Sequence, residues 1–134
     1  MPAISQWFFK AAVVFLILGL MMGLQMSITE NYNVTGAHAH TNLAGWVTGA
    51  LFGLYYALNP QKAETRLART HFFSYIFSVA VMAPGLYFWS MGYEIFAPFV
   101  AISAVVAFAS VLLFAYIVYA PAQRSSVPRS IAAE

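Results

Sequence analysis

Four long apolar stretches, separated by short polar segments, make up most of this chain of 134 residues. They cover residues 7–26, 37–58, 72–91 and 95–119. Each is close to the length of α-helix, about 20 residues, that crosses a bilayer. None has a polar face wide enough to meet water as a helix of a soluble protein does. The sequence therefore predicts an all-α integral membrane protein, with residues 1–120 forming one domain of four transmembrane helices and residues 121–134 a short cytoplasmic tail.

Composition supports this fold class and limits the chemistry. Hydrophobic residues make up 62% of the chain and charged residues 7%, which is too little charge to cover a soluble domain of this size. Cysteine is absent, so disulfides, thiolate metal sites and thiol redox chemistry are excluded. Any bound metal must use His, Met, Tyr or carboxylate ligands. The net charge of +2 does not form a basic stripe, so we expect no nucleic-acid partner.

The charged residues predict the orientation in the membrane. Two expected loops, between the first and second stretches and between the third and fourth, carry only Glu30 and Glu94, which we expect to be solvated. The basic residues all fall on the other side, at Lys10, Lys62, Arg66, Arg69, Arg124 and Arg129. By the positive-inside rule both termini are cytoplasmic, in a multi-pass protein surrounded by lipid. Pro84, well inside the third stretch, predicts a kink there.

Two of the three histidines, His38 and His40, lie near the outer start of the second stretch. Ionisable side chains are costly in a membrane, so such a pair marks a candidate functional site. At about 100° of rotation per residue, the two side chains project about 200° apart on a helix and cannot grip one metal together. The His38 face continues through Asn42, Gly45, Gly49, Phe52, Gly53 and Tyr56. The His40 face continues through Leu43, Ala44, Val47, Leu51, Leu54 and Leu58.

Each of these features has a second, purely structural interpretation. Glycines at every fourth position let helices pack closely, and a flat macrocycle needs the same clearance. The histidine pair can simply bond water and headgroups, and Met22 and Met26 can be apolar filling. Trp46 fits either an aromatic belt or a cofactor wall.

The inner side of the predicted membrane domain has its own polar residues. His71, at the cytoplasmic start of the third stretch, is expected at the interface among basic loop residues; a second, cytoplasmic site is the alternative. Tyr55 and Tyr56 are expected in an aromatic belt at the same side.

One segment resembles a known helix. His38, His40, Gly45, Trp46, Phe52, Gly53, Tyr55, Tyr56 and Pro60 form the pattern His-x-His-x4-Gly-Trp-x5-Phe-Gly, followed by a tyrosine pair and a proline. The pattern is similar to the tenth transmembrane helix of the catalytic subunit of haem–copper oxidases, in the cbb-type and nitric oxide reductase branch. The resemblance covers about a fifth of the chain. It implies that His38 corresponds to the high-spin haem ligand and His40 to the low-spin ligand, in a bacterial inner membrane.

The rest of the chain departs from that family. Its catalytic subunits have many more spans, and further histidines that hold copper and complete the low-spin haem. Here the one remaining histidine, His71, is expected about 30 Å away, on the other side of the membrane. The outer loops also lack Arg and Lys, the usual partners of haem propionates. We therefore do not expect oxygen reduction or assign an enzymatic activity.

The resulting hypothesis is a haem b-binding membrane protein that transfers electrons, handles haem or binds a gas. The candidate residues are His40 and then His38 as iron ligands, with Gly45, Trp46, Gly49, Met22 and Met26 as further cofactor contacts. A second protomer, related by a two-fold axis along the membrane normal, is the simplest source of another ligand, so we expect a homo-oligomer, with a dimer favoured. The alternatives are a copper-binding protein with histidine and methionine ligands, or a structural subunit without a cofactor.

Overall fold

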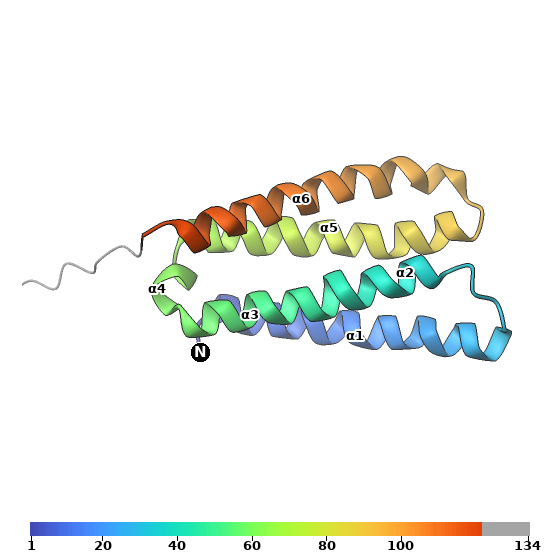
Figure 1. Ribbon diagram of the computed structural model, residues 1–134, viewed down its shortest axis with the longest axis horizontal. Helices are drawn as coiled ribbons and strands as arrows, with labels where there is room; N and C mark the ends of the chain where they lie inside the picture. Colours follow the sequence, from blue (N-terminus) through green and yellow to red (C-terminus); the bar gives the residue numbers. More distant parts are fainter. Residues whose placement is uncertain (122–134) are drawn as a thin grey trace, which may run out of the picture.

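The computed structural model describes residues 1–121, and this part of the chain contains helices and no strands. The helices form one elongated bundle (Figure 1). Within the described part, three helices are long and apolar enough to cross a membrane: α1 (Ala3–Thr29), α5 (Arg66–Ser90) and Glu94–Tyr119, which comprises η2 (Glu94–Phe96) and α6 (Ala97–Tyr119). The prediction of an all-α protein with membrane-spanning helices is confirmed at this level.

The second apolar stretch is helical throughout but not uniform. It consists of α2 (Thr35–His40), the π-helix η1 (Thr41–Thr48) and α3 (Gly49–Leu58), which follow one another without a break. In a π-helix the hydrogen bonds reach five residues back, and the Thr48 hydroxyl likewise donates to the Leu43 carbonyl at 2.8 Å. We call Thr35 to Leu58 the composite helix. The sequence predicted a regular helix here, so η1 is a difference from expectation.

The ends of the helices explain where the predicted boundaries shift. α5 begins at Arg66, before the expected start at residue 72, because the Thr65 side chain caps it by accepting from the Ala68 backbone N–H at 3.2 Å. α5 then continues through Pro84, so the predicted kink does not end the helix. The expected tail 121–134 lies outside the described residues apart from Pro121, as do Arg124 and Arg129.

A short helix, α4 (Pro60–Ala63), connects the composite helix to α5 and holds the end of α6. The Lys62 ammonium donates to the carbonyls of Ile117 and Val118 at 2.7 and 2.8 Å. These carbonyls lie in the last turn of α6, where a cation also complements the helix dipole. These two hydrogen bonds therefore connect α4 to the last turn of α6 at this end of the bundle.

Small residues bring α1 and the composite helix together. A side chain at Gly45 would place its Cβ 2.5 Å from Phe15, and one at Gly53 would meet Phe8 at 3.2 Å. The Ser5 hydroxyl of α1 donates to the Gly53 carbonyl at 2.7 Å. Such close approach is typical of membrane helices that pack through small residues. The glycine row therefore packs against α1 of the same chain.

Candidate functional site

The two faces predicted for the composite helix are segregated as expected. The face that continues from His38 is buried at Gly45, Gly49, Phe52, Gly53 and Tyr56. The opposite face is exposed at Leu43, Val47, Leu51, Leu54 and Leu58. His38 is half-buried and His40 is exposed. Because both histidines belong to α2 and precede the π-helix, their regular spacing holds, and the prediction that they serve different faces is confirmed.

His38 is held against α1. Its Nδ1 atom lies 2.8 Å from the Gly19 carbonyl oxygen. A carbonyl only accepts, so Nδ1 carries the hydrogen and Nε2 is left with a free lone pair. Gly23 makes room for the ring, because a Cβ there would lie 2.9 Å from Cε1 of His38. The Asn42 amide adds a bond to the His38 carbonyl at 2.9 Å.

His40 has the same tautomer in an open environment. Its Nδ1 atom lies 2.8 Å from the carbonyl oxygen of Gly36, one turn earlier in the same helix. Nδ1 is therefore the donor, and Nε2 has a free lone pair on an exposed side chain. A Cβ added at Gly36 would meet no heavy atom within 4 Å, so the space beside this turn is free.

A histidine whose Nδ1–H bonds a backbone carbonyl is arranged like the histidines that bind metals through Nε2. Both members of the pair have this arrangement. The described residues contain no group of three or more His, Cys, Asp or Glu that could hold a metal ion. Haem iron needs only one or two protein ligands.

The two candidate methionines lie on the enclosed side of α2. The Thr41 hydroxyl lies 3.8 Å from the Met22 sulfur, and the Thr35 hydroxyl lies 3.6 Å from the Met26 sulfur. Met26 is also buried. Both sulfurs thus lie where α1 packs against the start of the composite helix. The methionines therefore contact the start of the composite helix through Thr35 and Thr41, whereas His38 contacts α1 at Gly19 and Gly23.

Gly45 and Gly49 do not offer open clearance. Added Cβ atoms would meet Phe15 at Gly45 and Ala12, at 3.5 Å, at Gly49. A macrocycle on this face would require α1 to move, and the role of these glycines as cofactor contacts stays a prediction. Trp46, next to Gly45, is half-buried.

His71 differs most from expectation. The interfacial interpretation is wrong, because the side chain is 0% exposed. The expected span began after His71, whereas α5 begins at Arg66 and turns His71 inward. Tyr56, expected in an aromatic belt, is also fully buried, and its hydroxyl lies 3.0 Å from Nδ1 of His71. A signal was available: buried Ala68, His71 and Tyr75 recur at helical spacing.

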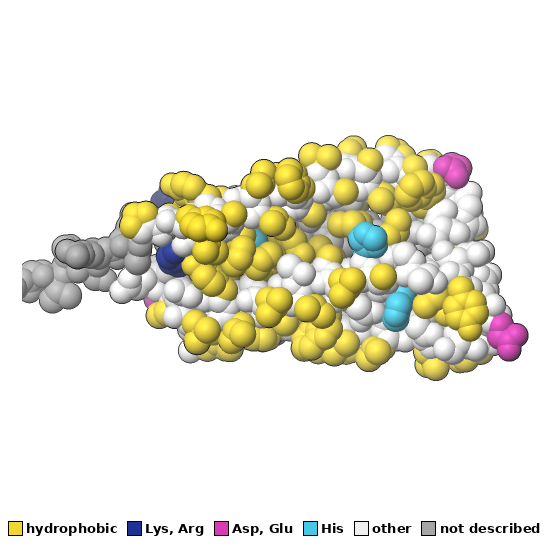
Figure 2. Space-filling view, viewed as in Figure 1, with side chains coloured by type: hydrophobic (Ala, Val, Ile, Leu, Met, Phe, Trp, Pro, Cys, Tyr) yellow, Lys and Arg dark blue, Asp and Glu magenta, His cyan; other side chains and the backbone are white. Residues whose placement is uncertain are grey.

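Most charges lie near the two ends of the bundle, and Glu64, at the end of α4, shares the end that carries the basic residues. In Figure 2 acidic side chains mark one end, and Lys and Arg are seen towards the end that carries α4. Glu30 and Glu94 are exposed, as expected of solvated loop charges, and Glu94 accepts from the Trp89 indole at 3.1 Å.

Comparisons with known proteins add no further guide to this site. No match was found among protein-family models, curated proteins or solved structures.

Proposed function

We propose that the chain is a haem b-binding membrane protein in which Nε2 of His40 is an axial ligand of the iron. The observation that supports this most directly is the 2.8 Å bond between Nδ1 of His40 and the Gly36 carbonyl, which leaves Nε2 as a free acceptor on an exposed ring. Beside it, Leu43 and Val47 are 62% and 41% exposed and offer an apolar surface for a porphyrin face.

The proposal includes four spans, with the composite helix as the second. The positions of the charges support an orientation with α4 and both termini on the cytoplasmic side, since Lys62, Arg66 and Arg69 lie by α4 and Glu30 and Glu94 lie in the opposite loops. The histidine pair then lies in the outer half of the membrane. The helix resemblance supports a bacterial inner membrane as the location in this proposal.

Because His40 is an exposed ligand on an apolar face, a second copy of the chain is needed to complete the proposed site. His40 projects away from the bundle, so its own protomer cannot cover the far side of a porphyrin. A two-fold axis along the membrane normal brings His40 of two protomers to the same depth. Haem held by two imidazoles supplies one-electron redox chemistry, so electron transfer with a redox partner is the favoured role.

Visible absorption of protein purified from cells supplied with excess haem tests the proposal. The parent protein should show an intense porphyrin band with the reduced spectrum of haem b, and His40→Ala should lose it. Leu58→Ala, on the same exposed face but at the opposite end of the composite helix from His40, is the matched control and should keep the band. Loss of the band in His38→Ala together with its retention in His40→Ala would contradict the choice of ligand.

Copper binding is the second candidate, favoured by the enclosed sulfurs. His38, Met22 and Met26 all lie at the interface of α1 and α2, and imidazole with thioethers suits cuprous ion. Colourless protein that contains stoichiometric copper by elemental analysis, after growth with excess haem, would replace the haem proposal with this one. Purified protein that contains neither haem nor metal would support the remaining alternative, a structural subunit without a cofactor.

A further inference from the structure

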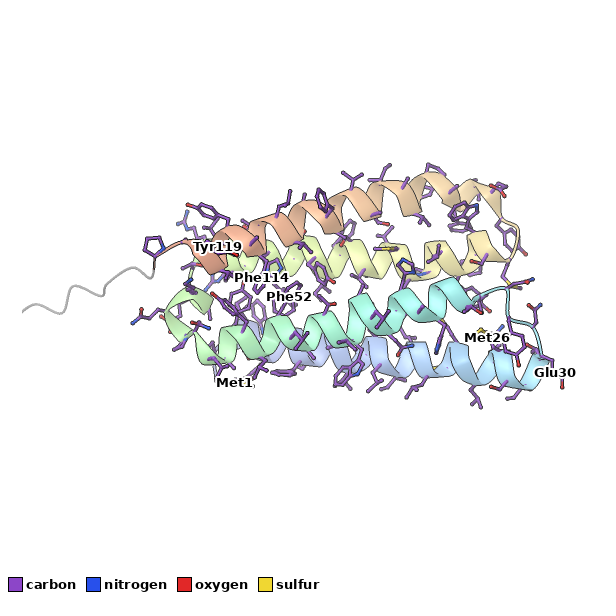
Figure 3. All side chains as sticks on the ribbon, in the orientation of Figure 1. Met1, Met26, Glu30, Phe52, Phe114 and Tyr119 are labelled. Atoms are coloured by element: carbon purple, nitrogen blue, oxygen red, sulfur yellow. The ribbon has the colours of Figure 1, made fainter. Side chains whose placement is uncertain are left out.

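The aromatic cluster around His71 is a second polar feature inside the bundle, separate from the histidine pair. His71 contributes from α5, and its ring centroid lies 4.6 to 5.3 Å from three phenylalanine rings: Phe8 of α1, Phe52 of α3 and Phe114 of α6. Figure 3 shows Phe52 and Phe114 at the end of the bundle that carries α4. One imidazole thus lies where α1, α3, α5 and α6 meet. We call this group the His71 cluster.

The hydrogen bonds of His71 are incomplete. Among the side-chain nitrogen and oxygen atoms that are buried in the described part of the chain, Nε2 of His71 lacks a hydrogen-bond partner. If the Tyr56 hydroxyl donates to Nδ1, the ring hydrogen is on Nε2 and finds no acceptor. If Nδ1 donates to Tyr56, the lone pair of Nε2 finds no donor. An unsatisfied buried polar group destabilises the folded state, and the packing of the rings must offset that cost.

Protonation of His71 would make the burial of its ring in this cluster much less favourable. The imidazolium carries a charge and has two N–H donors. The groups that face it are Phe8 from α1, Phe52 and Tyr56 from α3, Tyr75 from α5 itself, and Phe114 from α6. Only the two phenols among them can titrate, and none is a carboxylate. A buried charge without a counter-ion is costly, and cation–π contacts offset only part of that cost.

α6 has α5 as its main neighbour and little contact with α1 or the composite helix. It packs along α5 and closes the cluster through Phe114, which stacks on His71 at 5.1 Å and also contacts Tyr55 at 5.0 Å. At this end α6 is also held by buried Ile117, by the contact of Phe114 with Phe52 at 4.4 Å, and by the hydrogen bonds from Lys62 to the last turn of α6. A shift of Phe114 would admit water to Nε2 while leaving the contact of α1 with the composite helix in place.

We propose that the His71 cluster is an acid-operated latch: protonation of His71 displaces Phe114 and separates the α4 end of α6 from the rest of the bundle. His71 lies five residues into α5, about 7.5 Å along the helix from its start, so protons reach it from the side of the basic loop. The latch does not depend on haem binding.

Distances between two spin labels test the latch in the full chain reconstituted in lipid. The chain has no cysteine, so Gln6→Cys on α1 and Tyr119→Cys on α6, both exposed, give specific labelling sites. The pH is lowered from about 8 to about 3.5, starting above the ordinary imidazole pKa of about 6.5 and ending about three units below it. The expected result is a shift of the distance distribution to longer values at low pH, reversed on return to pH 8.

Three variants in the same labelled background separate the effect of His71 from that of the exposed acidic residues. His71→Phe keeps an aromatic ring and cannot take up a proton, so the shift should disappear. His71→Gln can still accept from Tyr56 and serves if the phenylalanine variant fails to fold, as judged by circular dichroism; it should also lose the shift. Tyr56→Phe keeps the imidazole and should keep the shift. An unchanged distance in the parent, or an equal shift in folded His71→Phe or His71→Gln, overturns the latch.

Discussion

His40 and His71 show how the same side chain differs between an open and an enclosed part of one membrane bundle. Each has Nδ1 in a hydrogen bond, at 2.8 Å to Gly36 and at 3.0 Å to Tyr56. The Nε2 atom of His40 is on an exposed ring beside an unfilled surface, whereas that of His71 is sealed among aromatic rings without a partner. The first arrangement suits a ligand that arrives from outside the chain. The second suits a response to a proton.

The largest expected difference between the two regions is in stability. His71→Ala removes a fully buried ring from the junction of four helices, so it should lower the free energy of unfolding by about 3 kcal/mol through loss of contacts and a residual cavity. His40→Ala should change it by less than about 0.5 kcal/mol, because the ring is exposed. Reversible denaturation in mixed detergent, followed by circular dichroism, measures both. Equal losses of unfolding free energy in the two variants would contradict the distinction between an enclosed region at His71 and an open region at His40.

Two glycines allow the same comparison of an enclosed and an open position, with smaller expected changes in stability. Gly45→Ala places a methyl group against Phe15 and should destabilise the bundle by about 1–3 kcal/mol through overpacking. Gly36→Ala adds the same group in open space and should be neutral or stabilise by up to about 1 kcal/mol, since alanine is the better helix former. The same denaturation assay compares them. A tolerated Gly45→Ala would mean that α1 can move away from the glycine row, as a cofactor there would require.

These contrasts also show what the sequence could and could not predict. The periodicity of the second stretch predicted its two faces, because burial on a helix follows from rotation per residue. It could not predict η1, since a change in hydrogen-bond register leaves hydropathy unaltered. The burial of His71 was missed because it depends on an early helix start capped by Thr65 and on Phe8, Phe52 and Phe114, which come from distant parts of the sequence.

The smallest expected difference concerns two serines of α1. Ser5 is buried and donates to the Gly53 carbonyl of α3, so Ser5→Ala should lower the free energy of unfolding by about 0.6 kcal/mol, the average for hydrogen bonds between membrane helices. Ser27 is exposed and bonds only within its own helix, to the Gly23 carbonyl at 3.2 Å. Ser27→Ala should have no measurable effect in the same assay. A larger loss at Ser27 than at Ser5 would contradict the assignment of enclosed and open regions.

The central claim is that the open site at His40 binds haem between two copies of the chain. Titration of haem into apoprotein reconstituted in lipid, followed by the porphyrin absorption band, tests it most directly. The account predicts saturation at one haem per two chains for the parent protein and for Leu58→Ala, and no saturable binding for His40→Ala. Saturable binding in His40→Ala with the affinity of the parent would contradict it.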